Sequence, residues 1–364
     1  MKAAVCRAHG EPLVIEELSI AEPQGRQIKV KIGACAICHS DIHYMEGAWA
    51  GELPAVFGHE AAGVVESVGP DVTQFQVGDR VIVTLIRSCG SCHYCDQGSP
   101  VMCDSARNED PTDLITSAAG EQVTQGMKTG AFAEYAVVEE TQAAAISADM
   151  PLDVASLLAC GVITGVGAVV NTARVPPGSS VVVVGVGGVG LNSIQGAAIC
   201  GASTIIAVDV EDSKLEVART FGATHGINAG EDKISRKIRS LTDGRGADYV
   251  FVTVGAKQAM DSSYRYIGRG GKVVIVGMPA IGVSSEFYPL ALAGSVQGIQ
   301  GSFMGETRLT VDIPWLLDLY KAGRLKLDEL ISNRFPLDQV NEAVEDTLSG
   351  RSLRNVLIIN QDLV

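Results

Sequence analysis

Basic side chains are scarce in this sequence, which carries 28 lysines and arginines against 42 aspartates and glutamates, a formal net charge of −14. Such a balance repels nucleic acid and anionic membrane surfaces, so it argues against a polyanionic partner. Internal repeats and low-complexity segments are also lacking. The first twelve residues, MKAAVCRAHGEP, hold no apolar run of signal-peptide length, and we therefore expect a cytoplasmic protein.

Long apolar runs that could cross a membrane are nearly absent as well. Two uncharged stretches, 154–173 and 178–208, reach the necessary length. The first contains three glycines, and the second is interrupted by Gly185, Gly187, Gly188, Gly190, Asn192 and Gln195. The second stretch is explained more simply as a buried strand, a helix and another buried strand of a parallel sheet. We expect no membrane partner.

What remains is the composition of a folded globular protein, with 46% hydrophobic residues and 41 glycines. At 364 residues the chain suits two domains better than one. Up to about residue 150, short β-type runs separated by glycine and proline predict an antiparallel, barrel-like domain, with strands at 28–32, 61–68 and 80–84. From about residue 175, strands alternate with helices, which is typical of βαβ units and a parallel sheet. The predicted strands there are 181–184, 204–208, 248–252 and 272–276, and the helices are 188–200 and 214–221.

The last part of the chain predicts two helices, 314–323 and 337–349, and a final strand, 354–359. We therefore predict an α/β protein in which a β-rich domain is interrupted by an inserted α/β domain, with the tail returning to the first.

A glycine-rich turn follows the strand predicted at 181–184. Its glycines are Gly185, Gly187, Gly188 and Gly190. They permit a tight turn and a close approach of the backbone to a pyrophosphate at the helix N-terminus. Asp209 follows at the end of the next predicted strand, where a carboxylate binds the adenosine ribose and repels a 2′-phosphate. A pattern of glycines in a turn is weak evidence by itself. With a strand before it, a helix after it and Asp209 at the end of the next strand, it predicts a site for NAD rather than NADP.

Four of the nine cysteines, Cys89, Cys92, Cys95 and Cys103, lie within fifteen residues. In a large, apparently cytosolic chain, clustered thiols indicate a metal more than disulfides. Four thiolates close a tetrahedral shell around zinc and leave no open position, which is typical of a structural site. We treat the nearby His93 as a bystander. Zinc-ribbon nucleic-acid binders also use such lobes, but the acidic charge disfavours that alternative.

A third set is dispersed: Cys38, His59 and Cys160. Singly, Cys160 suggests a core cysteine and His59 a turn histidine. Together they supply two thiolates and one imidazole, the ligands of a catalytic zinc with a vacant position. Spacing alone does not establish that they converge.

These motifs resemble those of the zinc-containing medium-chain alcohol dehydrogenases, and the likeness covers essentially the whole chain. Residues 58–63, GHEAAG, match the GHE-x-x-G signature of that family, residues 89–103 its structural zinc loop, and residues 185–190 its nucleotide loop. The resemblance implies a GroES-like catalytic zinc domain at 1–160, an NAD-binding Rossmann domain with a doubly wound parallel sheet at 161–300, and a return to the catalytic domain at 301–364.

The resemblance also implies two zinc ions per chain and NAD as cofactors. Cys38, His59 and Cys160 would ligate the catalytic zinc, with Glu60 as an outer or alternative fourth ligand, and Asp41 would hold the ring of His59. Ser40 would hydrogen-bond the alcohol oxygen, and His43 would end a proton relay that passes through a ribose hydroxyl of the cofactor. The remaining cofactor contacts implied are His39 and Arg354 at the pyrophosphate, Thr164 and Val189 at the nicotinamide, and Lys214 at the adenosine ribose. Many members carry arginine at position 39, so histidine there predicts faster cofactor release.

We therefore expect an NAD-dependent zinc alcohol dehydrogenase that transfers hydride reversibly between a primary alcohol and its aldehyde. Ser40 in place of threonine, and Leu85 where relatives have an aromatic wall, favour medium-chain or aromatic alcohols, while Trp49 narrows another side. The main alternative is a thiol-adduct (S-hydroxymethyl) formaldehyde dehydrogenase, because the loop between Cys103 and Gly130 is long. A polyol dehydrogenase and a zinc- and nucleotide-binding protein without turnover remain further alternatives. We expect a homodimer, with a homotetramer as the alternative.

Overall fold

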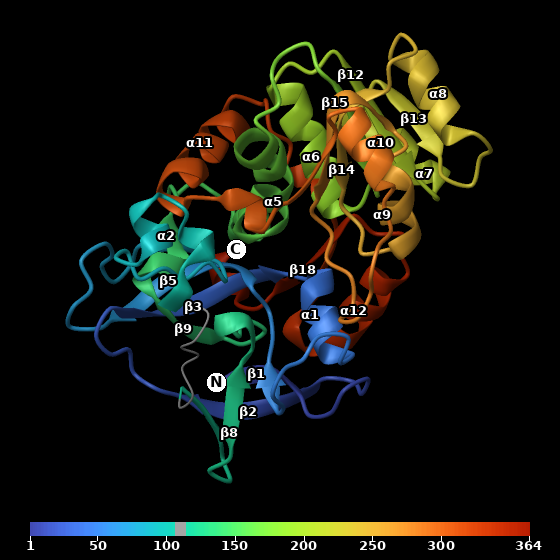
Figure 1. The fold of residues 1–364 in the computed structure, drawn as a ribbon. Helices are drawn as coiled ribbons and strands as arrows, with labels where there is room; N and C mark the ends of the chain where they lie inside the picture. The colour runs from blue at the N-terminus through green and yellow to red at the C-terminus, as the bar shows by residue number, and fades with distance from the viewer. Residues whose placement is uncertain (106–113) are drawn as a thin grey trace. The chain divides into compact units, whose positions relative to one another are not determined.

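The computed structural model describes residues 1–105 and 114–364 (Figure 1). The chain forms two compact units, one made of Met1–Gly161 and Arg308–Val364 and the other of Val162–Thr307. The second unit is therefore inserted into the sequence of the first, and the predicted α/β fold class is confirmed. Part of the long loop between Cys103 and Gly130, on which the thiol-adduct alternative rests, lies outside the described residues.

The first unit contains a small closed barrel and a larger, mostly antiparallel sheet. The barrel follows the order β1 (Lys2–Cys6), β2 (Val14–Ile20), β7 (Ile115–Ser117), β8 (Gln122–Gln125) and β4 (Ala55–Val56). The larger sheet follows the order β10 (Ala143–Ala145), β6 (Arg80–Val83), β5 (Glu60–Val68), β3 (Gln27–Ala36), β18 (Arg354–Ile358) and β17 (Ile331–Pro336), and β9 (Tyr135–Glu139) also pairs with β3.

Strand β3 shows why these residues form the core of this unit. Ile28, Val30 and Ile32 are fully buried, and they alternate with partly exposed residues, as a half-buried strand requires. The C-terminal strand β18 pairs antiparallel with β3, so the end of the chain belongs to the first unit. The helices of this unit are α1 (His39–Met45), α2 (His93–Asp96), α4 (Leu152–Ser156), α11 (Leu309–Lys321) and α12 (Val340–Leu348).

The second unit is built on a six-stranded sheet in which all neighbouring strands are parallel. Its order is β13 (His225–Asn228), β12 (Thr204–Asp209), β11 (Ser180–Val184), β14 (Ala247–Val252), β15 (Ile267–Ile275) and β16 (Gly298–Gly301). The chain starts in the middle at β11, runs outward to β13, and then crosses to β14 and the other edge. This is the doubly wound order, in which ligands bind at the carboxyl ends of the strands where the direction reverses.

Helices connect these strands and complete the α/β pattern (Figure 1). They are α5 (Gly161–Gly167), a π-helix (Ala168–Ala173), α6 (Gly188–Ile199), α7 (Asp212–Thr220), α8 (Ile234–Leu241), α9 (Lys257–Ser263) and α10 (Pro289–Gly294). All five residues of β11 are buried, as expected of a central parallel strand covered on both faces.

One helix begins earlier than the sequence predicts. The helix predicted at 314–323 starts at Pro314, and proline is a residue that the first helical position favours. The helix instead begins at Leu309, and Pro314 lies inside it. Asp312 stabilises the first turn by accepting the backbone N–H of Arg308 at 2.8 Å, so the helix forms despite the one hydrogen bond that proline cannot donate.

No single helix in the described part of the chain is long and apolar enough to span a membrane. Only the successive helices Leu152–Ala159 and Gly161–Ala173, taken together, reach the length and composition of a span.

Candidate active site and metal centres

Four side chains from three distant segments of the sequence meet in the first unit. Cys38, His59, Glu60 and Cys160 each offer a ligand atom, and these atoms all lie within 4.8 Å of one another. All four residues are buried. Cys38 is the N-cap of α1, Glu60 opens β5, and Cys160 follows a short 3-10 turn. The set predicted from sequence as dispersed is thus brought together by the fold.

A glycine places His59 at this position. Gly58 has φ +94°, a conformation that residues with side chains rarely adopt. A Cβ atom there would also lie 2.5 Å from Cδ1 of Phe132 and 2.6 Å from its backbone nitrogen. The turn before β5 therefore requires glycine, which explains the first letter of the GHE motif in structural terms.

Asp41 organises the site through three contacts. Its carboxylate accepts the backbone N–H of Cys38 at 3.2 Å and that of Gly58 at 2.9 Å, and its Oδ1 lies 3.0 Å from Nδ1 of His59. The carboxylate is fully buried. Asp41 thus fixes one end of α1, the turn before β5 and the ring of His59 together. A carboxylate that orients the imidazole in this way leaves Nε2 available to a metal.

The donors at this site fit a zinc ion. His59 Nε2 and Glu60 Oε1 are buried and have no hydrogen-bond partner within the described residues. Buried polar atoms are nearly always hydrogen-bonded. Two unpaired atoms close to the same two sulfur atoms therefore indicate a site that binds a metal ion. Two cysteines and one histidine form a known catalytic zinc set that leaves one position open.

The pKa values of Cys38, Cys160 and His59 indicate how firmly these buried groups hold their protons. The contact with Cys160 lowers the pKa of the Cys38 thiol, and the same contact raises that of Cys160. Burial alone would lower the pKa of His59, but Asp41 and the Cys38 thiolate together raise it well above its usual value. Metal binding must therefore release protons from the site, and its affinity falls as the pH falls.

Glu60 has a basic partner from the other end of the chain. Arg354, at the start of β18, forms an ion pair with Oε2 of Glu60. Arg354 is only 7% exposed, and its guanidinium packs against Gly161. A Cβ atom at Gly161 would lie 3.3 Å from Nη1 of Arg354. Burial raises the pKa of Glu60 to about 7, although Arg354 opposes the shift. Sequence reasoning assigned Arg354 only to the pyrophosphate and missed this pairing. The pyrophosphate role remains a prediction.

The four clustered cysteines form a second possible metal centre. The ligand atoms of Cys89, Cys92, Cys95 and Cys103 lie within 4.8 Å of one another, and none of these residues forms a disulfide. Sγ of Cys103 accepts the backbone N–H of Cys89 at 3.3 Å, and Sγ of Cys89 accepts that of Ser91 at 3.5 Å. Hydrogen bonds of this kind stabilise thiolates, and those from the backbone lower the pKa of Cys89 to about 5.

His93 stays outside this second set, as expected. It is exposed at the start of α2, and its ring lies 5.2 Å from that of Tyr94.

The glycine turn after β11 has the shape of a nucleotide loop. Gly185 has φ +89°, and Gly187 is the N-cap of α6. A Cβ on Gly190 would lie 1.9 Å from the carbonyl oxygen of Gly185, so this close helix–strand contact excludes any side chain. A Cβ on Gly187 would meet nothing within 4 Å, so the helix N-terminus is open to an approaching pyrophosphate.

Asp209 closes the same loop. It ends β12, and its Oδ2 accepts the backbone N–H of Val186 at 2.6 Å, while its Oδ1 accepts that of Glu211 at 3.1 Å. A carboxylate has further lone pairs, so these two bonds leave capacity for ribose hydroxyls.

The structure also places the other predicted cofactor contacts. In the second unit, Thr164 is buried with its hydroxyl 3.7 Å from the sulfur of Met304, and Val189 on α6 and Lys214 on α7 are half-buried. In the first unit, His39 is exposed at the start of α1. Their roles remain predictions.

Sequence reasoning missed Thr253, which supports the loop. It directly follows β14, the strand beside β11 in the sheet, and its hydroxyl donates to the carbonyl oxygen of Gly185 at 2.6 Å. The signal was available, since a polar residue at the carboxyl end of this strand stands at the point where the strand order reverses.

We expect Asp209→Asn to narrow the preference for NAD over NADP by about 10- to 100-fold. The substitution removes a negative charge that repels a 2′-phosphate and weakens charge-assisted hydrogen bonds to the ribose. The asparagine oxygen can still accept the N–H of Val186, so the loop should stay intact. The measurement is kcat/KM for both cofactors, with Asp212→Asn on the neighbouring α7 as the control. A wild type that uses NADP as well as NAD would contradict the role of Asp209.

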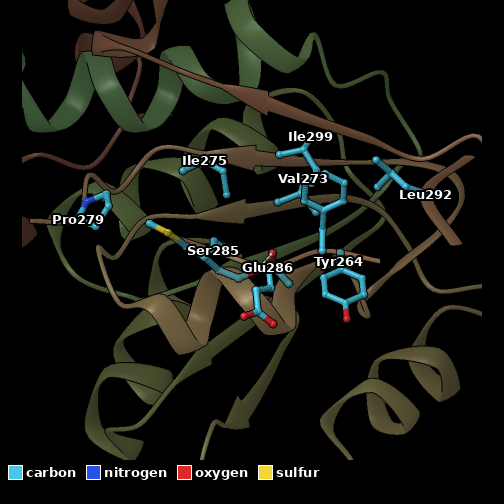
Figure 2. Close-up of a pocket in the computed structure, with 11 residues that line it drawn as sticks. Tyr264, Val273, Ile275, Pro279, Ser285, Glu286, Leu292 and Ile299 are labelled. Atoms are coloured by element: carbon cyan, nitrogen blue, oxygen red, sulfur yellow. Dashed lines mark hydrogen bonds between the residues drawn. The ribbon is translucent and has the colours of Figure 1, made fainter. Parts of the chain in front are cut away.

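The described residues also form an apolar cavity whose lining residues belong to neither metal set. It has a volume of about 510 Å³ and is lined from β15, β16, α9 and the segment that follows β15 (Figure 2). Tyr264, Val273, Ile275, Leu292 and Ile299 point into it. None of the predicted site residues lines this cavity.

Comparison with known proteins agrees with this geometry. A family model described as "Alcohol dehydrogenase GroES-like domain" matches residues 24–149, and one described as "Zinc-binding dehydrogenase" matches residues 188–322.

Individual proteins match over nearly the full length. The NDMA-dependent alcohol dehydrogenase of Amycolatopsis methanolica is 36% identical over 99% of this chain and 99% of its own. An alcohol dehydrogenase zinc-binding domain protein from Burkholderia ambifaria has a TM-score of 0.94 at 36% identity, covering 99% and 98% of the two chains. The benzyl alcohol dehydrogenase of Acinetobacter calcoaceticus has a TM-score of 0.93 at 33% identity, covering 99% of each chain.

Proposed function

The chain belongs to the zinc-containing medium-chain alcohol dehydrogenase family, and from this premise we propose how its own residues oxidise an alcohol. The enzyme is an NAD-dependent zinc oxidoreductase that acts on CH–OH groups and reverses the reaction with an aldehyde. One observation carries the proposal for the site. Cys38, His59 and Cys160 converge around a buried, unpartnered Nε2 atom beside the oriented carboxylate of Asp41.

Each protein group has a defined part in this mechanism. When bound, zinc lowers the pKa of a hydroxyl that it coordinates, and NAD accepts hydride. Asp41 keeps the imidazole of His59 in the tautomer and orientation that ligation needs. Arg354 balances the buried charge of Glu60, which otherwise faces two thiolates. The Ser40 hydroxyl accepts the proton of the alcohol as it gives up its own to the relay, and His43, one turn later on α1, accepts the relayed proton and releases it towards solvent.

We expect His43→Gln to slow alcohol oxidation by about tenfold at pH 6 to 7 and progressively less towards pH 9. General-base catalysis contributes this much or more, and hydroxide replaces the lost base as the pH rises. Zinc content and NAD affinity should not change, because His43 belongs to neither metal set. The test is a pH–rate profile with and without added small imidazole bases. A profile identical to that of wild type would refute the relay.

For the substrate, we propose a primary alcohol of medium length or with an aromatic ring. Ser40, Trp49 and Leu85 are all half-buried in the first unit. Ser40 is one methyl group smaller than the threonine of many relatives, and Leu85 is smaller than the aromatic residue that other relatives have at this position. Both differences should widen the substrate channel. The structural likeness to a benzyl alcohol dehydrogenase supports the same substrate class.

Extending the substrate from ethanol to hexanol should therefore raise kcat/KM by about two orders of magnitude. Each buried methylene contributes about 0.8 kcal/mol of transfer free energy, or about fourfold. Leu85→Phe should reduce this gain, and it serves as the matched variant because it alters the wall without touching a metal ligand. Rates would be compared across a series of linear alcohols. A flat or falling series would show that the channel is closed, and a rate that requires added thiol and formaldehyde would favour the thiol-adduct alternative.

We further propose that the enzyme is a homodimer. Strand β16 forms an edge of its sheet, pairing on one side with β15, and exposed edges commonly pair with a second chain. Large apolar side chains are exposed around it, namely Met278, Ile281, Phe287, Tyr288, Leu290, Val296, Ile299 and Phe303. Sedimentation equilibrium on the zinc-loaded enzyme distinguishes a dimer from a tetramer, and a monomer would contradict the proposal.

A further inference from the structure

Three aromatic rings continue from the side chain of His43. The ring of Trp49 lies 5.0 Å from that of His43, with the planes inclined at 43°. Tyr44 meets Trp49 edge-on at 5.4 Å and stacks on Phe57 at 5.9 Å. Phe57 is buried and stands two residues before His59. We call Tyr44, Trp49 and Phe57 the aromatic cluster. It joins the end of α1 to the segment that carries a metal ligand.

His43 needs such support because hydrogen bonding does not fix its ring. Its Nδ1 is buried and has no hydrogen-bond partner in residues 1–105 or 114–364. An imidazole has two freely rotating side-chain bonds, so packing must hold it where no hydrogen bond does. The aromatic contact of this ring is the one with Trp49.

The backbone fixes Trp49 in turn. Its N–H donates to the carbonyl oxygen of His43 at 3.2 Å, which folds the chain back after α1. The fold-back passes through Gly47, which has φ +75°. The ring of His9 packs against Gly47, and its Nδ1 lies 3.1 Å from the carbonyl oxygen of Tyr44. Trp49 therefore has little freedom to leave His43.

We propose that Trp49 is a positioning residue for proton transfer. Its indole holds the His43 ring so that Nδ1 stays in place to accept the proton. The electron-rich indole face also attracts the imidazolium that forms when the proton arrives. This inference rests on the proposed relay role of His43. It differs from the substrate-pocket role of Trp49, which concerns the shape of the channel and not the proton.

A double-mutant cycle separates the two roles. We expect Trp49→Leu to lower kcat about fivefold at pH 6 to 7 and less at pH 9, and Trp49→Phe, which keeps a ring, to stay within about twofold of wild type. In a His43→Gln background, Trp49→Leu should have no further effect on kcat. Changes in KM for bulky alcohols should persist in both backgrounds, because they report on the channel.

Two outcomes would count against different claims. If Trp49→Leu lowers kcat equally with and without His43, Trp49 does not act through His43 and the inference fails. If His43→Gln itself leaves the pH–rate profile unchanged, the relay fails first.

A spectroscopic measurement tests the contact without turnover. The chain has two tryptophans, and Trp315 lies half-buried on α11, so Trp315→Phe leaves Trp49 as the sole indole. Because an imidazolium quenches an indole that it contacts, emission from zinc-loaded Trp315→Phe enzyme should fall on acidification from pH 8 to 5. His43→Gln should abolish this change.

Other titratable groups near this segment are His39 and Asp41 on α1 itself, His9, and the exposed Glu46 and Glu52. The variants His9→Gln, Glu46→Gln and Glu52→Gln, each in the Trp315→Phe background, should keep the quenching. Quenching that survives His43→Gln, or that disappears with one of these three variants, would overturn the assignment.

Discussion

Replacing Cys38 by alanine should reduce kcat/KM for alcohol oxidation by about three orders of magnitude while leaving the fold nearly intact. The substitution removes one of two thiolates from the predicted catalytic zinc set. A Lewis-acid metal contributes several kcal/mol to such a reaction, and each 1.4 kcal/mol is a factor of ten. The fold should survive because the N-cap of α1 is bound through the backbone N–H of residue 38, which donates to Asp41 in either variant.

Metal analysis and calorimetry check both halves of this expectation. The Cys38→Ala enzyme should hold one zinc per chain instead of two, and its Tm should stay within a few degrees of wild type. Cys200→Ala is the matched control, since Cys200 is half-buried at the end of α6 and belongs to neither metal set. A Cys38→Ala enzyme with two zinc ions and normal turnover would refute the ligand assignment.

The parts of the molecule that sequence predicts well are those whose signals are local. The nucleotide loop and the four-cysteine lobe each lie within one short segment, so residue type and spacing suffice. Strands such as β3 and β5 follow from alternation of buried and exposed positions. By contrast, β13 and β16 have the sequences HGIN and GIQG, which carry little strand propensity. They form strands because neighbouring parallel strands supply the hydrogen bonds, which is tertiary context.

Tertiary context matters even more for the predicted catalytic zinc site. Cys38, His59 and Cys160 could be proposed as a set only through the family resemblance, because their convergence depends on α1, β5 and the turn before α5 meeting in space. The ion pair of Glu60 with Arg354 joins residues 294 positions apart, through the pairing of β18 with β3 and of β3 with β5. No periodicity or spacing encodes such a contact.

Cys103→Ser should have the opposite effect to Cys38→Ala, with a large loss of stability and a modest loss of turnover. Among the lobe residues 89–103, only Val101 and Cys103 are buried, so the segment has almost no apolar core of its own. A metal bound by four thiolates would supply most of its order, as structural zinc does in other small lobes. We expect Tm to fall by about 10 °C, which corresponds to about 3–5 kcal/mol for a unit of this size.

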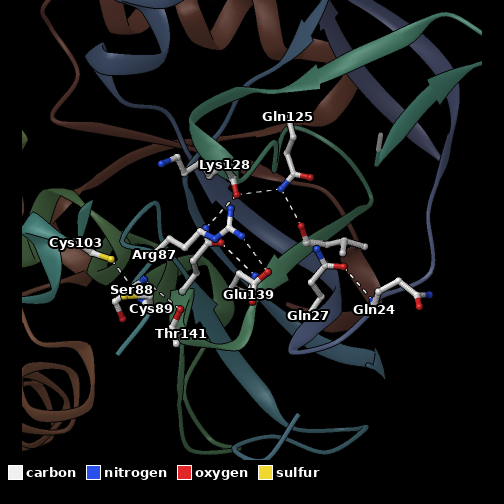
Figure 3. A network of polar contacts seen from close by, with 12 residues as sticks. Gln24, Gln27, Arg87, Ser88, Cys89, Cys103, Gln125, Lys128, Glu139 and Thr141 are labelled. Carbon is white, nitrogen blue, oxygen red and sulfur yellow. Dashed lines mark hydrogen bonds and ion pairs between the residues drawn. The ribbon is translucent and has the colours of Figure 1, made fainter. Parts of the chain in front are cut away.

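The residues just before the lobe limit how far unfolding spreads in Cys103→Ser. Arg87 pairs with Glu139 at 3.2 Å, and the backbone N–H of Ser88 donates to the hydroxyl of Thr141 at 3.3 Å (Figure 3). These contacts tie the segment just before Cys89 to the end of β9 and to the turn that follows it, independently of the four sulfur atoms. Local unfolding should therefore stop near residue 88, and limited proteolysis should cut Cys103→Ser within the lobe first.

His93→Ala decides whether the four cysteines alone hold this metal. His93 is the remaining imidazole in the lobe, and it lies outside the ligand set, so the variant should keep two zinc ions and the wild-type Tm. Cys103→Ser should keep one zinc ion and, at low temperature, a kcat within a few-fold of wild type. If Cys103→Ser retained two zinc ions and full stability, the lobe would not be a zinc site. If instead Cys103→Ser lost turnover as completely as Cys38→Ala, the two centres would not have separate roles. Both substitutions would then act on the same function.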